Sequence, residues 1–250
     1  MIAIITGASS GIGREFARQV DKKGYKEIWL IARRKERLVD LEKSLKTKVK
    51  ILDLDLLEDE SFVIIEKILE KLKPQIGLVV NAAGLGYPDY FSEEGLEKSQ
   101  RTLRLNCEAL TKINYLVLSY MAKDSAIINI ASVAAFIPQP KFATYAASKS
   151  YVLSFSRAIN REVRDRGINV CALCPNPVNT EFFKNSGDEE ASKIKSLGTE
   201  NLEHLVEKTL RLCHKKDLVT THPVSGFLKF LSKILPHSFI MFLEKKIGMY

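Results

Sequence analysis

The 250-residue sequence has no apolar run long enough to span a bilayer, and it has only four cysteines. Its longest apolar stretch, residues 126–138, is well short of the roughly 20 residues that a spanning helix needs. Residues 1–5 run directly into a glycine-rich segment, so we expect no targeting peptide before the fold. Few cysteines without a signal sequence are typical of a reducing compartment. We therefore expect a cytoplasmic protein with free thiols.

A set of metal ligands is also missing from the sequence. Cys171 and Cys174 have the C-x-x-C spacing of redox and zinc sites, but no second Cys/His pair follows at ligand spacing. Both lie in the strand-like run 168–174, in which residues three apart point to opposite faces. We predict no metal site and no redox pair at these cysteines.

Negative charge is in deficit, since 38 Lys and Arg against 30 Asp and Glu give a net charge of +8. The lysines are scattered from Lys22 to Lys246 and do not gather with aromatic residues into a stripe, so we predict no nucleic-acid partner. A basic surface of this kind would attract an anionic dinucleotide. The mixed composition, without repeats or Gly/Pro/Ser tracts, predicts one globular domain over residues 1–250.

Short β-branched runs alternate with longer segments of helical period. This alternation predicts a Rossmann-type, doubly wound parallel sheet of about seven strands with helices on both faces, in the α/β class. The expected strands are 2–6, 27–32, 48–54, 76–81, 126–131, 168–174 and 217–221. The expected helices are 12–22, 35–46, 60–72, 94–122 (in one or two pieces), 144–165 and 201–214. Such sheets bind ligands at the carboxyl ends of their strands, so we expect the chemistry just after the strands.

A glycine-rich loop joins the first strand to the first helix. Residues 6–13 read TGASSGIG and are followed at once by the amphipathic residues 14–17. Glycines allow a tight turn and a close approach to a pyrophosphate, and the helix N-terminus offers unpaired N–H groups. An ordinary turn could have a similar composition, but the strand–turn–helix context favours a dinucleotide-binding loop.

Basic residues follow the second expected strand. Arg33, Arg34 and Lys35 stand where an acidic residue would select NADH by binding the ribose 2′-hydroxyl. Arginine can hold a 2′-phosphate through fork-shaped hydrogen bonds, whereas a solvated helix start is the alternative interpretation. We predict NADPH as the preferred cofactor, with NAD as the second choice.

Three polar residues after the middle of the chain form a catalytic candidate. Tyr145 and Lys149 open a long expected helix at i, i+4 spacing, so they share one face. A nearby ammonium favours the phenolate, and we therefore expect a lowered pKa for Tyr145. Ser132 ends a buried strand and supplies a hydroxyl that could hold a substrate oxygen.

With the glycine loop, these pieces resemble the short-chain dehydrogenase/reductase family over about the first 180 residues. The matching pieces are TGASSGIG at 6–13, Asn-Ala-Ala-Gly at 81–84, Asn106, Ser132, and Tyr145 with Lys149. The resemblance implies that Tyr145 is the general acid and that Ser132 shares the carbonyl oxygen. It also implies that Lys149 lowers the pKa of the tyrosine and binds the nicotinamide ribose, while Asn106 holds a water that links Lys149 to solvent.

The resemblance further implies a set of cofactor contacts. They are Gly7, Ser9, Ser10, Gly11, Ile12, Gly13, Arg33, Arg34, Asp55, Asn81, Ala82, Gly84, Tyr145, Lys149, Pro175, Val178 and Thr180. Asp55 resembles the adenine-side contact, with Asp53 as an open alternative, and Thr180 resembles the residue that holds the carboxamide. The sequence departs from the family at Asn176 and Ala135, where glycine is frequent.

The function implied is hydride transfer between a nicotinamide cofactor and a carbonyl or alcohol substrate. The alternative is a catalytically silent dinucleotide-binding regulatory protein, and the complete set of four catalytic residues favours the enzyme. Residues 181–200 are expected to form a substrate lid, whose Phe182 and Phe183 indicate an apolar substrate. We also expect a homo-oligomer.

The segment 225–250 is expected to be an amphipathic C-terminal extension. Apolar residues at 227, 228, 230, 231, 234 and 235 predict a helix that Pro236 ends, and a second apolar run follows at 239–243. The helix could cover its own domain near the pocket, form a subunit interface or lie on an anionic membrane. Packing on its own domain is the first expectation, a subunit interface the second and a membrane surface the third.

Overall fold

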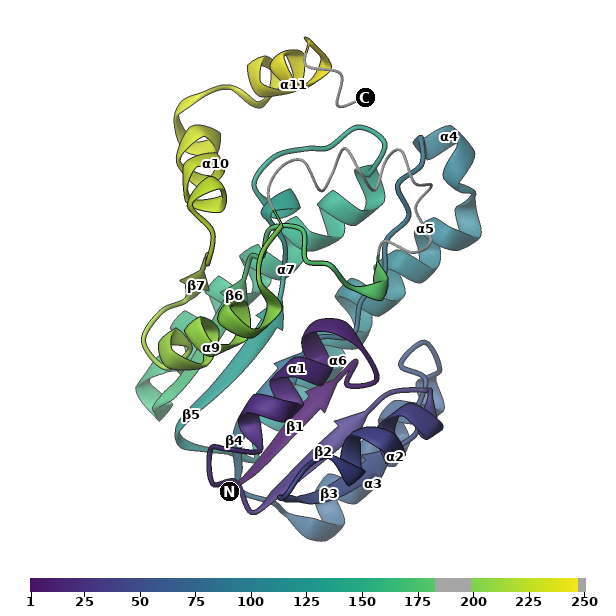
Figure 1. Cartoon of the computed structure of the whole chain (residues 1–250), viewed down its shortest axis with the longest axis vertical. Helices are drawn as coiled ribbons and strands as arrows, with labels where there is room; N and C mark the ends of the chain where they lie inside the picture. Colours follow the sequence, from purple (N-terminus) through teal and green to yellow (C-terminus); the bar gives the residue numbers. More distant parts are fainter. Residues whose placement is uncertain (183–198, 247–250) are drawn as a thin grey trace.

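Seven parallel strands form a sheet at the centre of the molecule (Figure 1). The computed structural model describes residues 1–182 and 199–246. The strands are β1 (Ile2–Thr6), β2 (Glu27–Ile31), β3 (Lys48–Leu52), β4 (Ile76–Asn81), β5 (Met121–Ile130), β6 (Ile168–Leu173) and β7 (Leu218–Val219). Their order is β3-β2-β1-β4-β5-β6-β7, so the predicted doubly wound parallel sheet is confirmed.

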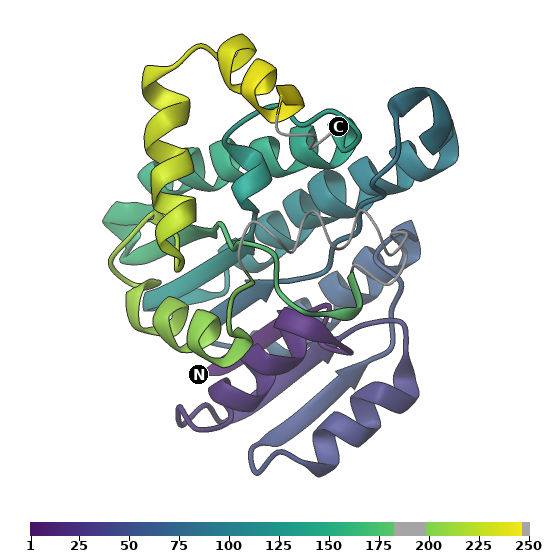
Figure 2. The ribbon, with the colours of Figure 1, turned by 45° about the horizontal axis from the view of Figure 1, so that its top comes forward.

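Helices cover both faces of this sheet (Figure 2). The helices of the described residues are α1 (Gly11–Val20), α2 (Lys35–Lys43), α3 (Asp59–Leu72), α4 (Phe91–Glu94), α5 (Leu96–Leu103), α6 (Leu110–Leu118), α7 (Ala143–Val163), α9 (Leu202–Leu212), α10 (Pro223–Ile234) and α11 (His237–Lys246). Alternate residues of a strand point to opposite faces, and Ile5 of β1 packs with Phe16 of α1 and Leu205 of α9. On the other face, Ile4 packs with Ile65 of α3. Burying both faces explains why these strands are almost continuously apolar.

The order of the strands reverses between β1 and β4. The chain builds outward from β1 to β3 and then crosses back, so that β4 pairs with the other side of β1. Loops that leave these two neighbouring strands diverge to opposite faces and leave a crevice at their carboxyl ends. Residues 7–10 and 82–85, which follow β1 and β4, are therefore placed to bind a ligand.

The helix expected over 94–122 is wrong in its extent. The segment contains α5, a π-helical stretch over Arg104–Ala109 and α6, and helical structure ends at Leu118. Met121 already pairs with Ile76, so the last expected helical residues belong to strand β5. The polar residues Lys123 and Asp124 lie inside β5 and are exposed there, so the sequence pattern does not mark the boundary between helix and strand.

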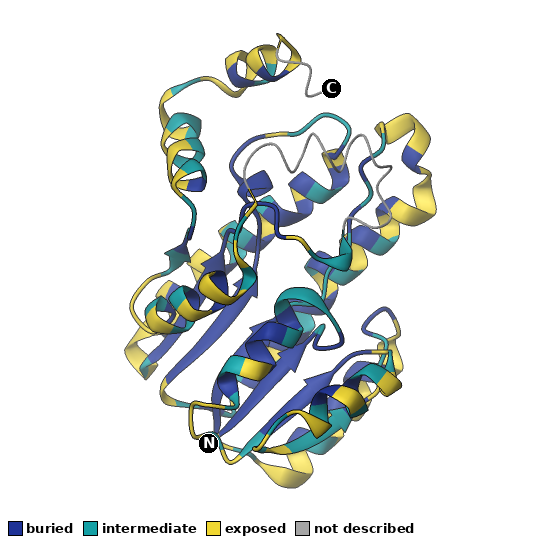
Figure 3. Ribbon diagram, viewed as in Figure 1, coloured by how far each residue is buried: buried dark blue, intermediate teal, exposed yellow. Residues whose placement is uncertain are grey.

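The C-terminal segment forms two helices that project from the body (Figure 1). Helix α10 ends at Ile234 before Pro236, as the sequence predicts, and α11 begins directly after that proline. Both helices present extended exposed surfaces, whereas the strands are buried (Figure 3). No helix among the described residues is long and apolar enough to cross a membrane. Most of the expected lid, residues 183–198, lies outside the described residues.

Candidate active site

A pocket of about 520 Å³ lies at the carboxyl ends of the strands. This volume is in the range of ordinary ligand and cofactor sites. Most of the predicted site residues line it: Gly7, Ser9, Ser10, Gly11, Ile12, Gly13, Arg33, Arg34, Asp55, Ala82, Gly84, Ser132, Tyr145, Lys149, Pro175, Val178 and Thr180. The structure therefore brings residues from seven separate stretches of the sequence to one cavity.

The glycine loop after β1 is packed so closely that side chains would not fit. A Cβ on Gly13 would lie 2.5 Å from the carbonyl oxygen of Gly7, and one on Gly7 would lie 2.7 Å from the carbonyl carbon of Ala82. Gly7 and Gly11 also have positive φ angles of 65° and 52°, which disfavour other residues. The glycines thus let the loop pack directly against itself and against the backbone after β4, and this packing brings the N-terminus of α1 to the pocket, where a pyrophosphate would bind.

Arg34 connects the glycine loop to the residues after Thr180. Its guanidinium donates to the hydroxyls of Ser9 (Nη2 to Oγ, 2.9 Å) and Ser10 (2.7 Å). The carboxylate of Glu181 accepts from Arg34 at 3.1 Å and from Arg37 at 2.6 Å. These two arginines hold the pKa of Glu181 low, at about 2. An anion is therefore already stabilised between two arginines at the edge of the pocket.

Of Asp53 and Asp55, the two candidates for the adenine-side contact, only Asp55 lies at the pocket wall. Asp55 lines the pocket and lies 3.6 Å from Arg33, whereas Asp53 pairs with Lys35 at 3.3 Å and does not line it. Asn81 is the one predicted cofactor contact that the structure does not bring to the pocket wall. It is buried, and its amide donates to Asn129 at 2.8 Å, so its side chain serves the interior of the sheet.

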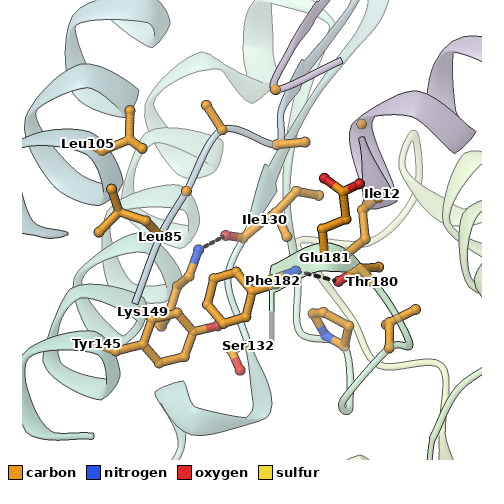
Figure 4. A pocket seen from close by; sticks show the side chains of 18 of the residues that line it. Ile12, Leu85, Leu105, Ile130, Ser132, Tyr145, Lys149, Thr180, Glu181 and Phe182 are labelled. Carbon is orange, nitrogen blue, oxygen red and sulfur yellow. Dashed lines mark hydrogen bonds between the residues drawn. The ribbon is translucent and has the colours of Figure 1, made fainter. Parts of the chain in front are cut away.

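Tyr145, Lys149 and Ser132 lie together inside the pocket (Figure 4). Helix α7 carries the first two on one face, and Ser132 follows β5. Lys149 is buried, and its Nζ donates to the carbonyl of Ile130 at 2.7 Å while lying 5.6 Å from the centroid of the Tyr145 ring. The fold thus places the three residues in one pocket.

The expected lowering of the Tyr145 pKa is wrong for this arrangement. Burial raises the pKa of Tyr145 to about 12, although a hydrogen bond with Ser132 opposes the rise. Burial also lowers the pKa of Lys149 to about 8. Lys149 gives its hydrogen bond to Ile130, so the phenol remains protonated at neutral pH and is suited to donate a proton.

Asn106 lies in the π-helical stretch Arg104–Ala109 and does not line the pocket itself. Its amide oxygen accepts from the N–H of Leu85 at 2.9 Å, and its nitrogen donates to the carbonyl of Leu85 and to the hydroxyl of Ser148. A Cβ on Gly84 would approach both the Asn106 oxygen (3.2 Å) and Lys149 Nζ (3.4 Å). Asn106 therefore fixes the loop after β4 beside the lysine.

Aromatic residues cover Tyr145. The ring of Phe142 stacks on Tyr145 at 4.3 Å between centroids, and that of Phe182 lies at 5.4 Å. A Cβ on Gly86 would lie 2.4 Å from a Tyr145 ring carbon, so the backbone there touches the ring. The sequence indicated Phe182 as part of an apolar lid, but it gave no signal for Phe142 or Gly86.

Asn176, one of the two departures from the family pattern, ties the C-terminal segment to the pocket. It lines the pocket, and its amide nitrogen lies 3.1 Å from Nδ1 of His222. Its amide oxygen accepts from the hydroxyl of Ser225 at 2.6 Å. A glycine at 176 could make neither side-chain contact, so asparagine here positions the start of α10.

Glu244 of α11 is a pocket residue that the sequence did not indicate. Its side chain lines the pocket, and it has no hydrogen-bond or ion-pair partner among the described residues. Burial raises its pKa to about 7. The C-terminal helix therefore closes part of the pocket wall with a carboxyl group that is half-protonated near neutral pH.

We expect Glu244→Gln to stabilise the protein at pH 8 relative to wild type and to give a smaller gain at pH 5. Between the ordinary pKa of 4.5 and the raised value near 7, the folded state binds a proton that the unfolded chain lacks. Wild-type stability therefore falls as pH rises through this window, and glutamine removes the effect. Urea midpoints at several pH values measure it, with Glu97→Gln on the exposed side of α5 as control. A pH-independent difference would contradict the assignment.

Comparison with known proteins agrees with this geometry. A family model described as short chain dehydrogenase matches residues 1–191. The 17-beta-hydroxysteroid dehydrogenase type 3 of Mus musculus is 34% identical over 191 residues, which are 73% of this chain and 61% of that protein. The very-long-chain 3-oxoacyl-CoA reductase of Anas platyrhynchos is 31% identical over 98% of this chain and 83% of that protein.

Solved structures share the fold over almost the whole chain. A short chain dehydrogenase/reductase from Burkholderia phymatum in complex with NAD has a TM-score of 0.82 at 21% identity, covering 97% of this chain and 94% of that one. A short-chain dehydrogenase from Sphingobium yanoikuyae in complex with NADPH has a TM-score of 0.76 at 27% identity, covering 94% and 96%. Both nicotinamide dinucleotides therefore occur among proteins of this architecture.

Proposed function

Because the chain belongs to the short-chain dehydrogenase family, we propose that it reduces an apolar ketone or aldehyde with a nicotinamide dinucleotide. The observation that carries this proposal is the placement of Tyr145, Ser132 and Lys149 in the same pocket as the glycine loop. The alternative of a silent regulatory protein has no observation in its favour, since all four catalytic residues are present and assembled. Oxidation of NADPH in the presence of a panel of aldehydes and ketones tests the proposal.

The residues of the pocket divide the reaction between them. The carbonyl oxygen accepts hydrogen bonds from Tyr145 and Ser132, and Tyr145 donates its proton to that oxygen as the alcohol forms. Lys149 would hold the nicotinamide ribose, and its positive charge beside the phenol would stabilise the phenolate left by proton transfer. The dinucleotide, when bound, supplies the hydride. Asn106 holds the loop after β4 beside Lys149 through its hydrogen bond with the backbone of Leu85.

The side of the pocket at the end of β2 supports a preference for NADPH. Arg33 and Arg34 line the pocket, and Arg37 lies one turn into α2 with its guanidinium on the same carboxylate as Arg34. The carboxylate of Glu181 shows that an anion can be held there by two guanidinium groups. A 2′-phosphate of NADPH would take the same type of hydrogen bonds.

We expect Arg34→Ala to lower the ratio of kcat/KM for NADPH to that for NADH by about tenfold or more. Each charge-assisted hydrogen bond to a phosphate contributes roughly 1.5 to 3 kcal/mol, and about 1.4 kcal/mol is one factor of ten. The variant also loses its contacts to Ser9 and Ser10, which affect both cofactors, so the ratio is the informative quantity. Lys35→Ala is the matched control, because Lys35 lies outside the pocket wall and pairs with Asp53. An unchanged ratio in Arg34→Ala would overturn the preference.

The substrate we propose is bulky and apolar. Phe142 and Phe182 pack against the ring of Tyr145, and Leu85 lines the same pocket. Two relatives are named for hydroxysteroids and for very-long-chain 3-oxoacyl groups, which are both large apolar molecules. Steroid ketones and long-chain 3-oxoacyl thioesters are therefore the first compounds to assay, with short ketones as comparison.

Assembly and location are further proposals. Exposed apolar side chains on neighbouring helices, Tyr115 of α6 and Tyr151 of α7, support a homo-oligomer that covers them. Thr111 and Tyr151 share a hydrogen bond of 2.8 Å between these two helices, so the surface is preformed. The four cysteines are free, which supports a location in a reducing compartment such as the cytoplasm.

A further inference from the structure

The two C-terminal helices carry an apolar surface that the fold leaves uncovered. Six large side chains of α10 and α11 are between 42% and 60% exposed. They are Phe227, Phe230, Ile234, Phe239, Phe242 and Leu243. We call this set the C-terminal apolar face. Single exposed apolar side chains are normal on a protein surface. Four exposed aromatic rings within residues 227–242 are instead typical of a surface that binds a partner.

The arrangement of the face follows from helical periodicity. Phe227, Phe230 and Ile234 are three and four residues apart, so they lie on one side of α10. In α11, Phe239, Phe242 and Leu243 likewise share one side, whereas Ile240 and Glu244 on the other side are buried toward the body. Helix α11 therefore has two functions in packing: its inner side lines the pocket and its outer side faces solvent.

Positive charge accompanies this face. Lys233, Lys245 and Lys246 are exposed on the same two helices, and Lys246 Nζ lies 6.0 Å from the ring centroid of Phe242. Glu244 is the one acidic residue of α10 and α11, and it is turned inward to the pocket wall. Aromatic side chains with lysines among and beside them are typical of helices that lie at the surface of an anionic bilayer.

We propose that the C-terminal apolar face docks peripherally onto an anionic lipid bilayer, with α10 and α11 lying along its surface. The rings would enter the boundary between headgroups and acyl chains, and the lysines would contact the anionic headgroups. A second copy of the chain fits this face less well, because a two-fold interface places the same patch on itself and would bring the lysines of the two copies together.

Docking in this way would present the pocket to the bilayer. The inner side of α11 forms part of the pocket wall through Glu244, and Asn176 in the pocket holds the start of α10 through His222 and Ser225. The same two helices thus contact the lipid on one side and the pocket on the other. An apolar substrate dissolved in the bilayer could pass to the pocket without crossing water.

Sedimentation with vesicles tests the proposal on the full chain. The wild type should bind vesicles of equimolar phosphatidylglycerol and phosphatidylcholine and bind pure phosphatidylcholine much less. Phe227→Ser/Phe230→Ser/Phe242→Ser should lose at least about tenfold in partitioning to the anionic vesicles, since each removed ring withdraws apolar area from the interface. Phe91→Ser/Leu96→Ser removes similarly exposed apolar side chains from α4 and α5 and should bind as wild type.

A second variant changes only exposed lysines, so a loss of binding in it would not result from misfolding. Lys233→Glu/Lys246→Glu retains the rings, and each lysine near an anionic surface contributes about fivefold to binding, so the reversal should also cost at least about tenfold. Raised salt should weaken wild-type binding in the same direction. Failure of the wild type to bind anionic vesicles, or equal loss in the α4/α5 control, would overturn the proposal. A dimer that dissociates only in the triple variant would assign the face to a second copy instead.

Discussion

Replacing Tyr145 with phenylalanine is expected to lower turnover by about a hundredfold or more and to leave cofactor affinity nearly unchanged. The substitution removes one hydroxyl, which is the proton donor in the proposed reaction, and positioned acid catalysis contributes factors of this size. The ring contacts with Phe142 and Phe182 are retained, so the pocket should keep its shape. Steady-state kinetics and dinucleotide titration measure the two quantities separately.

The neighbouring hydroxyl provides the comparison for this experiment. Ser132→Ala should reduce turnover less than Tyr145→Phe, because Ser132 shares the carbonyl oxygen and gives up no proton to it. The pKa of Tyr145 should rise further in that variant, since the hydrogen bond with Ser132 opposes the effect of burial. Turnover retained in Tyr145→Phe would show that another group protonates the substrate and would remove the basis of the mechanism.

Much of this fold could be predicted because its signals are local. Strands buried on both faces read as short apolar runs, and β1 and β4 were predicted to the residue. The failure at residues 119–122 has a physical origin: β5 begins at Met121, ahead of the exposed and charged Lys123 and Asp124, so the polar interruption of the sequence falls inside the strand. A periodicity argument places the boundary at the polar residues and therefore begins the strand too late.

The candidate site likewise has residues that the sequence predicts and residues that it does not. The residues of the glycine loop follow one another in the sequence and Tyr145 and Lys149 share one helix, so spacing alone places each group together. Glu181 meets Arg34 and Glu244 enters the pocket only because the chain returns there from distant segments. Asn81 shows the opposite case, since its motif predicts a cofactor contact while its side chain binds Asn129 inside the sheet.

The direction of the Tyr145 pKa also could not be predicted from spacing. The i, i+4 relation to Lys149 predicts that the two side chains share a helix face, and they do. It does not predict how deeply the face is buried or which acceptor the ammonium chooses. In the folded chain the carbonyl of Ile130 takes the hydrogen bond, and burial determines the pKa of both groups.

Lys149 should show the second large effect. We expect Lys149→Met to lower turnover by about a hundredfold and to weaken dinucleotide binding as well, because the ammonium is assigned both to the ribose and to the phenolate. Methionine has a similar volume and no charge, so packing beside Tyr145 should persist. Equal cofactor affinity in wild type and variant would refute the ribose contact, whereas unchanged turnover would refute the electrostatic role.

The pH dependence of stability distinguishes a buried ammonium from a residue that only fills space. The pKa of Lys149 is about 8 in the folded chain, below its ordinary value of 10.5, because burial disfavours the charge. Between these values the unfolded chain binds a proton that the folded chain lacks, so wild-type stability rises with pH across this window. Lys149→Met lacks this group. The urea midpoint of the wild type should therefore rise relative to that of Lys149→Met between pH 8 and pH 10. The turnover rate of the wild type should also fall above about pH 8, because Lys149 then loses the proton and the positive charge that stabilises the phenolate. A stability difference that stays constant with pH would show that Lys149 is not desolvated in the folded protein, and the electrostatic argument for its role would then fail with it.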